Sequence, residues 1–141
     1  MGNSYQKRAG AAYQEQVTGI PRNSDGSTTE YRVPYEPGPG ERQPYVDFDG
    51  HVQRGQPPQE FLLDAKDGYQ KPLIDQPWPN AQRSQLSKFE AEAARQLRAL
   101  EQTGSDAGVE WHFSDEECAD IVRQDFEEKG IDVDIVYTPS T

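Results

Sequence analysis

The stretch that decides the fold runs from residue 45 to residue 69, YVDFDGHVQRGQPPQEFLLDAKDGY. Its first part, residues 45–49, alternates apolar and acidic side chains and ends at Gly50. Its second part, residues 61–66, follows a pair of prolines and places apolar residues beside charged ones. Alternation with a period of two is typical of strands, and prolines and glycines interrupt them. We therefore predict two short strands that pair as a bent antiparallel unit.

Two aspartates and a lysine give these strands a candidate chemistry. Alternate residues of a strand share a face, so Asp64 lies beside Lys66, and a neighbouring strand can bring Asp49 to the same place. Two carboxylates at close range repel each other unless a cation joins them, and hard oxygen ligands suit Mg²⁺ or Mn²⁺. A lysine beside the ion can position or deprotonate water, or stabilise charge on phosphorus. The pattern indicates a phosphodiester hydrolase, although ordinary solvent-facing charges on two amphipathic strands would give it too.

Helices and further strands are predicted around this unit. The clearest helix follows Asn80, a candidate N-cap, and ends near Gly104. Its apolar residues recur at three- and four-residue steps, namely Leu86, Phe89, Ala93, Leu97 and Leu100. A second helix is predicted from a capping box at Ser114 to Gly130, and a short one over residues 11–17. Alternation predicts strands over residues 30–33, 109–113 and 131–137.

This order of elements defines a fold class. A helix, a three-strand meander, a helix and crossover strands imply an α/β fold with a mixed central sheet flanked by helices. At 141 residues the chain fits one domain. We expect that domain to span residues 11–141, after a polar tether or linker over residues 1–10.

The net charge of −11 argues at face value against a nucleic-acid binder. The charge is unevenly distributed, however, because residues 104–141 hold 11 acidic and 2 basic side chains. A phosphate-binding face must then come from the centre of the chain, where the predicted helix carries four cations: Arg83, Lys88, Arg95 and Arg98. The acidic last quarter is better suited to a basic protein partner.

Several kinds of site and segment are not expected. The single cysteine, Cys118, permits no internal disulfide and is predicted to be a buried thiol in a helix. The two histidines, His51 and His112, form no zinc-binding pattern, and His112 is predicted to lie in a core strand. No apolar run approaches the ~20 residues that cross a bilayer, and no signal peptide is expected at the N-terminus.

Five blocks of the sequence resemble the restriction-endonuclease-fold toxin domain, subtype 5, of the PD-(D/E)xK nuclease superfamily. They occur in the order of that family and cover nearly the whole chain. The blocks are residues 13–19 (YQEQVTG), 46–50 (VDFDG), 62–69 (LLDAKDGY), 111–113 (WHF) and 136–139 (VYTP).

The resemblance implies a restriction-endonuclease-like core and a toxic nuclease of bacterial polymorphic toxins, including type VI secretion effectors. It implies delivery by a specialised secretion system, without a signal peptide, and action in the cytoplasm of a target cell. The implied partners are a nucleic-acid substrate, which is expected to be DNA, a cognate immunity protein, and the components that deliver the toxin. No interaction with a membrane is expected. The implied cofactor is Mg²⁺ or Mn²⁺.

Carried over by position, the resemblance implies that Asp49 and Asp64 bind the divalent ion and that Lys66 is the catalytic lysine. Asp47 competes with Asp49 for the first metal position. Asp49 is preferred because it belongs to the block at residues 46–50, where Gly50 permits a sharp bend.

A fourth acidic residue is implied on the first helix. Glu15 matches the acid that many superfamily members contribute from that element. Gln14 and Gln16 flank it, so the phase of the helix decides which side chain faces the site.

A second class of function also fits the sequence. The chain could be a catalytically inactive, nuclease-like binding module, or an immunity or adaptor module that uses its acidic C-terminal surface. The joint presence of Asp49, Asp64 and Lys66 favours the enzyme, because an inactive fold would have little reason to keep all three.

Overall fold

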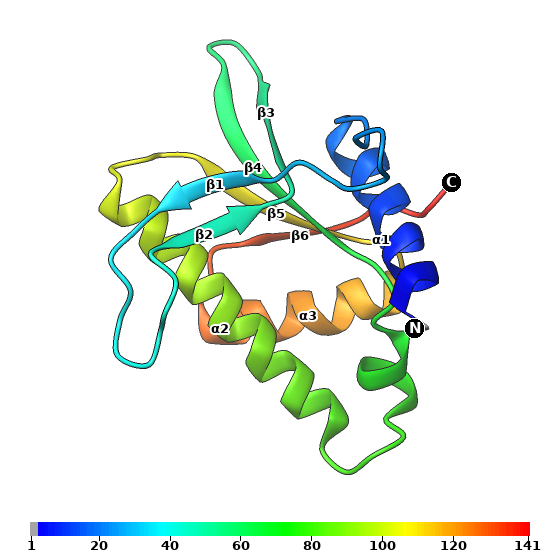
Figure 1. Cartoon of the computed structure of the whole chain (residues 1–141). Helices are drawn as coiled ribbons and strands as arrows, with labels where there is room; N and C mark the ends of the chain where they lie inside the picture. Colours follow the sequence, from blue (N-terminus) through cyan, green and yellow to red (C-terminus); the bar gives the residue numbers. More distant parts are fainter. Residues whose placement is uncertain (1–2) are drawn as a thin grey trace.

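A computed structural model describes residues 3–141 of the chain, with a central sheet and helices packed around it (Figure 1). The longest segments without a regular element lie between α1 and β1 and between β1 and β2. The elements in chain order are α1 (Asn3–Thr18), β1 (Tyr31–Pro34), β2 (Tyr45–Phe48), β3 (Gly50–Arg54), β4 (Gln59–Lys66), the short helical turn η1 (Lys71–Asp75), α2 (Ala81–Gln102), β5 (Gly108–Phe113), α3 (Glu116–Lys129) and β6 (Asp134–Tyr137).

The main sheet has the strand order β3-β4-β5-β6. Strand β3 lies antiparallel to β4, whereas β4, β5 and β6 run parallel to one another. Strands β1 and β2 form a separate antiparallel pair. The predicted α/β class, with a mixed sheet flanked by helices, is therefore confirmed.

The predicted three-strand meander needs a correction at Asp49. Strand β2 pairs with β1 and ends at Phe48, and after Asp49 the chain starts β3 and pairs with β4 instead. The strand over residues 45–49 was expected to pair with that over residues 61–66, but β4 pairs with residues 50–54, which were not predicted to be a strand. Residues 51–54 contain a single apolar side chain, that of Val52. The alternation of apolar and polar residues that predicts a strand is therefore absent.

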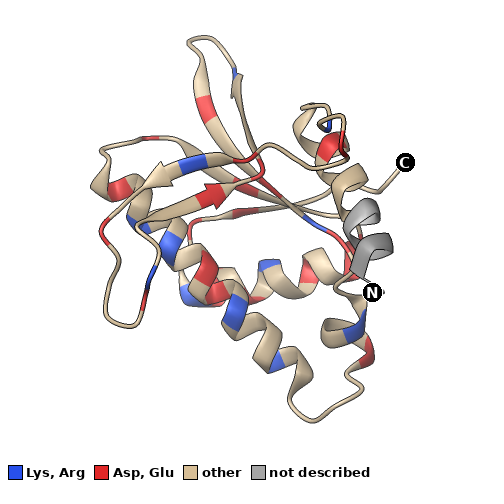
Figure 2. Cartoon of the chain, in the orientation of Figure 1, with Lys and Arg blue, Asp and Glu red and all other residues tan. Residues whose placement is uncertain are grey.

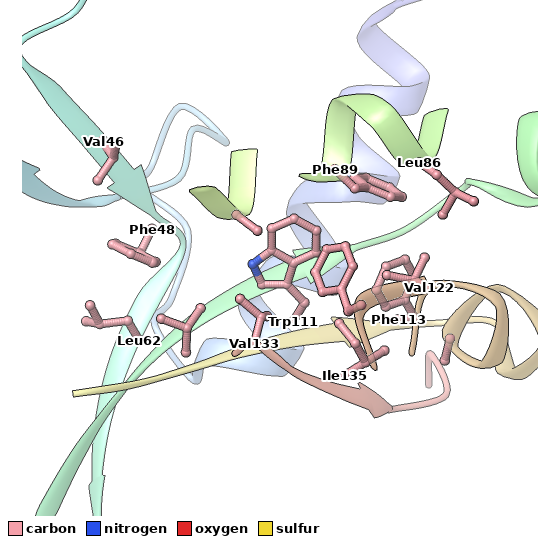
Figure 3. Packing of buried hydrophobic residues seen from close by; sticks show 14 of the residues in the cluster. Val46, Phe48, Leu62, Leu86, Phe89, Trp111, Phe113, Val122, Val133 and Ile135 are labelled. Atoms are coloured by element: carbon pink, nitrogen blue, oxygen red, sulfur yellow. The ribbon is translucent and has the colours of Figure 1, made fainter. Parts of the chain in front are cut away.

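Helices α2 and α3 bury the apolar core against one face of the main sheet (Figure 3). Trp111 of β5 lies between the two helices, with its ring centroid 5.4 Å from that of Phe89 on α2 and 5.4 Å from that of Phe126 on α3. All three side chains are almost fully buried. Truncating one large buried aromatic residue costs about 3–5 kcal/mol, so β5 anchors both helices, as its predicted core position requires.

Helix α1 covers part of the opposite face of the sheet. The Tyr13 hydroxyl donates a hydrogen bond to the Thr138 carbonyl at 2.7 Å, which ties α1 to the end of β6. At the other end of the helix, a Cβ on Gly50 would lie 2.8 Å from two side-chain carbons of Thr18. Gly50 is thus required at the bend for the close approach of α1, rather than for a positive φ angle.

The ends of two helices and the start of one strand differ from the sequence predictions. Asn80 precedes α2 in a left-handed conformation and makes no capping bond through its side chain. The N-cap of α3 is Asp115, which accepts a hydrogen bond from the Cys118 N–H at 2.9 Å, while Ser114 donates to Asp67 instead. Strand β6 begins at Asp134, later than predicted. Cys118 is buried, as expected.

The N-terminal segment is only partly open to comparison with its prediction. Residues 1 and 2 of the expected tether lie outside the described residues, and α1 begins at Asn3, well before the short helix predicted over residues 11–17. Within residues 3–141, no helix has both the length and the apolar character that crossing a bilayer requires.

We expect Gly50→Ala to lower the free energy of unfolding by about 1–3 kcal/mol, because the added methyl group overpacks the contact with Thr18. Urea unfolding measures the change. Gly10→Ala, where a Cβ meets nothing within 4 Å on α1, should be neutral or stabilising. Equal effects of the two substitutions would contradict the close-approach argument.

Candidate active site

The bend at Asp49 fastens this residue to β4 through both its backbone and its side chain. The Asp49 N–H donates to the Leu63 carbonyl at 2.9 Å and lies 3.1 Å from Oδ1 of Asp64. In return, Oδ2 of Asp49 accepts the Ala65 N–H at 2.7 Å. Oδ1 of Asp49 has no protein partner among the described hydrogen bonds, so it is the oxygen left for a ligand.

Asp64 and Lys66 occupy alternate positions of β4 and point toward α2, as strand parity predicts. Oδ2 of Asp64 accepts a hydrogen bond from Nε2 of Gln96 at 2.6 Å. Nζ of Lys66 lies 3.8 Å from the same Asp64 oxygen and 2.6 Å from Oε1 of Glu92. The ammonium also sits 4.3 Å from the centroid of the Trp111 ring, a cation–π contact. The three predicted residues therefore meet in one cluster with two residues of α2, and Asp64, Lys66 and Gln96 of this cluster are buried.

Asp47 and Glu15 lie outside this cluster. Asp47 accepts a hydrogen bond from Nε of Arg32 at 2.9 Å on the β1–β2 pair, which favours Asp49 as the residue facing the site. Glu15 accepts the backbone N–H of Arg22 at 2.7 Å and pairs with its guanidinium. The helical phase instead turns Gln14 toward the space beside Asp49.

An open cavity of about 650 Å³ adjoins Asp49. Its walls come from α1, the loop at residues 25–28, the end of β4 and Tyr69. Among the described residues that line it are three carboxylates, those of Asp25, Asp49 and Asp67, and no lysine or arginine. A phosphodiester entering this cavity would therefore need a cation to offset the negative charge.

Burial shifts the ionisation of the clustered groups. It raises the pKa of Asp64 to about 7, with help from the charges of Asp49 and Glu92 and against the opposing effect of Lys66. Burial likewise raises the pKa of Asp49. Burial alone would lower the pKa of Lys66, but the carboxylates of Asp64 and Glu92 outweigh it and hold that pKa above its ordinary value. Lys66 is thus a cation at neutral pH.

The donor set fits a Mg²⁺-type ion. Asp49 lines the cavity and its N–H contacts the buried Asp64; both carboxyl groups have raised pKa values, and a bound cation would relieve their mutual repulsion. Within residues 3–141 there is no cluster of three or more histidine, cysteine or acidic side chains arranged to enclose a metal. Mg²⁺ suits such a site, since it keeps several waters and is held by only one or two carboxylates together with phosphate oxygens.

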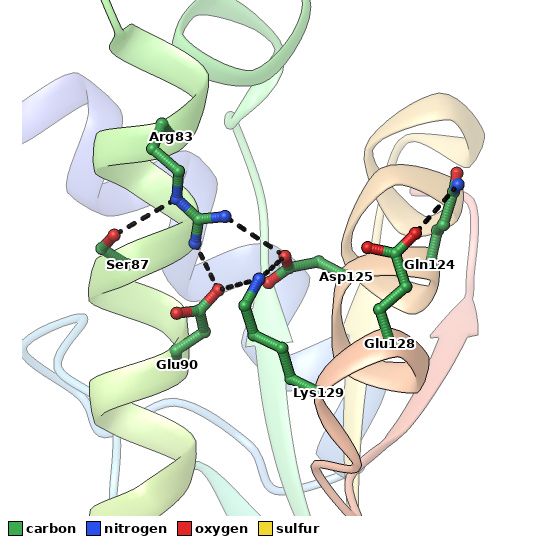
Figure 4. A network of polar contacts seen from close by, with 7 residues as sticks. All are labelled: Arg83, Ser87, Glu90, Gln124, Asp125, Glu128 and Lys129. Carbon is green, nitrogen blue, oxygen red and sulfur yellow. Dashed lines mark hydrogen bonds and ion pairs between the residues drawn. The ribbon is translucent and has the colours of Figure 1, made fainter.

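The predicted phosphate-binding face of α2 is only partly available. Arg83 is engaged with Glu90 and Asp125 in a cluster that links α2 to α3 (Figure 4), and Arg98 pairs with Glu41. Lys88 is exposed, and Arg95 borders a second cavity of about 180 Å³ next to Glu92 and Gln96. Figure 2 shows that α2 carries acidic as well as basic positions along its length. Two of the four predicted cations therefore hold the fold together instead.

Glu92 and Gln96 were not identified from the sequence. Gln96 falls three residues after Ala93 and four before Leu100, on the apolar stripe of α2, and it is 1% exposed. A polar side chain at a core position requires a hydrogen-bonding partner, and this was the signal that could have been noticed. Glu92 lies one turn earlier on the same side of the helix.

Comparison with known proteins gave one match. A family model described as restriction endonuclease fold toxin 5 matches residues 10–116, which include the C-terminal part of α1, the bend at Asp49, β4 and α2. No curated protein and no solved structure matched the chain.

In the metal-free protein, we expect Asp64 to make the free energy of unfolding fall as the pH rises from about 4 to 7. Folding raises its pKa from 3.8 to about 7, so the folded state binds more protons in this window, and stability present below pH 4 is lost as the pH passes 7. Asp64→Asn should flatten the fall, as measured by urea unfolding in EDTA. Asp47→Asn is the control, because Arg32 lowers the pKa of Asp47 out of this window.

Proposed function

This chain belongs to the restriction endonuclease fold toxin 5 family, and we propose that it is a metal-dependent nuclease that hydrolyses phosphodiester bonds. The family is one of nuclease toxins, which implies a nucleic-acid substrate. The observation that carries the proposal is the contact of Asp49 with Asp64 beside Lys66, where Asp49 also lines an open cavity.

Asp49 and Asp64 would hold the ion, Mg²⁺ or Mn²⁺. Once bound, it supplies Lewis-acid polarisation of a phosphate oxygen and a more acidic water molecule. The protein fixes the two carboxylates beforehand, since the Ala65 N–H holds one and the Gln96 amide holds the other. Little rearrangement is then needed when substrate arrives, which is the usual source of electrostatic rate enhancement.

Lys66 acts in this proposal as a fixed positive charge. Its raised pKa means that the ammonium form persists at neutral pH, so it is poorly suited to accept a proton. An ammonium beside the scissile phosphate stabilises the negative charge that grows on the phosphoryl oxygens as the bond breaks. Burial of the side chain against Trp111 keeps water from screening that charge.

The substrate we propose is DNA, cut in the cytoplasm of a target cell. The protein would serve as the toxin domain of an antibacterial effector that a specialised system, such as type VI secretion, delivers through its own components. Membership of a nuclease toxin family supports this role. Lys88 and Arg95 on α2 are available for phosphate contacts, because the described ion pairs do not include them.

A cognate immunity protein would neutralise the domain in the producing cell. We propose that it presents a basic surface to α3 and β6, whose segment of the chain holds 11 acidic and 2 basic side chains. Both basic residues are already paired, Arg123 with Asp120 and Lys129 with Asp125. The surplus negative charge therefore remains on exposed residues such as Glu116 and Glu127.

We expect the purified chain to degrade plasmid DNA with Mg²⁺ and to be inactive with EDTA. Asp64→Asn and Lys66→Ala should each lower the rate by about a hundredfold or more, because each removes a charge at the reacting phosphate. Gel electrophoresis of plasmid and of a matched RNA measures rate and substrate preference, and circular dichroism checks folding. Asp47→Asn should stay active, and wild-type activity in the Asp64 and Lys66 variants would overturn the site.

We expect Glu127→Lys to slow association with the immunity protein and to weaken its salt dependence, because long-range attraction between opposite charges sets the association rate. Surface plasmon resonance at several ionic strengths measures both quantities. Glu101→Lys, an equally exposed position on α2, is the control. Identical association rates for both variants would move the interface away from α3.

A further inference from the structure

Helix α2 places two side chains, one turn apart, directly against the acid and the lysine of β4. Gln96 reaches Asp64 at 2.6 Å, and Glu92 reaches Lys66 at 2.6 Å. Residues four apart lie on the same side of a helix, so one helical face addresses both residues. Neither α2 residue lines the cavity beside Asp49; both border the smaller cavity on the other side of the cluster.

The orientation of the Gln96 amide is determined by Trp111. The indole N–H can only donate, and it lies 2.9 Å from Oε1 of Gln96, so that atom must be the amide oxygen. The amide nitrogen therefore faces Asp64 and donates to Oδ2. This chain of two hydrogen bonds fixes the rotation of the Asp64 carboxylate from within the core.

Glu92 holds Lys66 at a defined place. The ammonium is 2.6 Å from Glu92 but 3.8 Å from Asp64, so its hydrogen bond goes to the helix and not to the neighbouring aspartate. Asp64 is consequently left with the Gln96 amide and the Asp49 N–H as its donors. A carboxylate that makes no direct hydrogen bond to an ammonium keeps more of its charge available for a metal ion.

Packing alone does not explain the amide of Gln96, although the side chain is fully buried. At position 96 a methionine has a similar length and would suit the apolar stripe of α2, whereas a buried amide costs free energy unless both of its groups are bonded. Both groups of Gln96 are bonded, one of them to the side chain that the proposed chemistry uses. This pairing is what a supporting residue of a metal ligand requires.

We propose that Glu92 and Gln96 are positioning residues of the nuclease site, Gln96 by orienting Asp64 for the metal ion and Glu92 by fixing the ammonium of Lys66. The inference rests on the proposed function. The two roles are separable, because Gln96 affects the affinity for the metal ion and Glu92 affects the rate of turnover.

The test uses Gln96→Met and Glu92→Gln, with Glu101→Gln as the matched control on an exposed part of α2. Gln96→Met should raise the Mg²⁺ concentration for half-maximal cleavage about 10–100-fold, because the Asp64 carboxylate is no longer oriented. Glu92→Gln should lower kcat about 10–100-fold with little change in the Mg²⁺ requirement or in KM for DNA. Mn²⁺ binding by calorimetry gives a readout of metal affinity without cleavage.

The outcomes separate this inference from the proposed function. If both variants match Glu101→Gln in metal affinity, kcat and KM, or change only the melting temperature, the positioning role is overturned. If the wild type binds Mn²⁺ but cleaves neither DNA nor RNA, the proposed function fails, and a weaker Mn²⁺ affinity of Gln96→Met still supports the role of Gln96. A wild type that binds no divalent ion would overturn both.

Discussion

The structure depends on a change of pairing partner at Asp49, where strand β2 ends and strand β3 begins. Before this residue the chain pairs with β1, and after it the chain pairs with β4, so the backbone groups of Asp49 are free to bond the neighbouring strand. The aspartate then receives a backbone N–H from β4 and gives its own to Asp64. Without this change of partner Asp49 would make neither contact with β4, and its carboxylate would not lie beside that of Asp64.

Such a junction buries charge at a cost that the surrounding network offsets. Isolated charges in a protein interior are strongly unfavourable, and they persist only where partners and hydrogen bonds compensate them. Here the compensation comes from three directions: the N–H groups of β4 and the bend, the amide of Gln96, and the Glu92 carboxylate beside Lys66. The pKa values of Asp49 and Asp64 are nevertheless raised, so a bound cation would stabilise their ionised forms.

The sequence predicted the local elements of this site better than their connections. Strand parity placed Asp64 beside Lys66, and flanking blocks identified the family. Periodicity could not reveal β3, whose residues lack alternation, nor the fact that Arg83 and Arg98 are engaged within the fold. It also could not show that Gln96 bonds Asp64, because the two residues are 32 positions apart and meet only when α2 crosses the sheet. Local sequence patterns predict on which face of a strand a residue lies, whereas tertiary packing determines which distant side chain it contacts.

Trp111 has a consequence for how such chains can diverge. Its ring fills the space between α2 and α3, while its N–H orients the amide that bonds Asp64. A phenylalanine could keep much of the packing but would leave the Gln96 oxygen without a donor. The two hydrogen bonds thus couple the residue types that positions 64, 96 and 111 can carry. A relative without the indole would need another donor for the Gln96 oxygen, or another residue to hold the carboxylate of Asp64 in place.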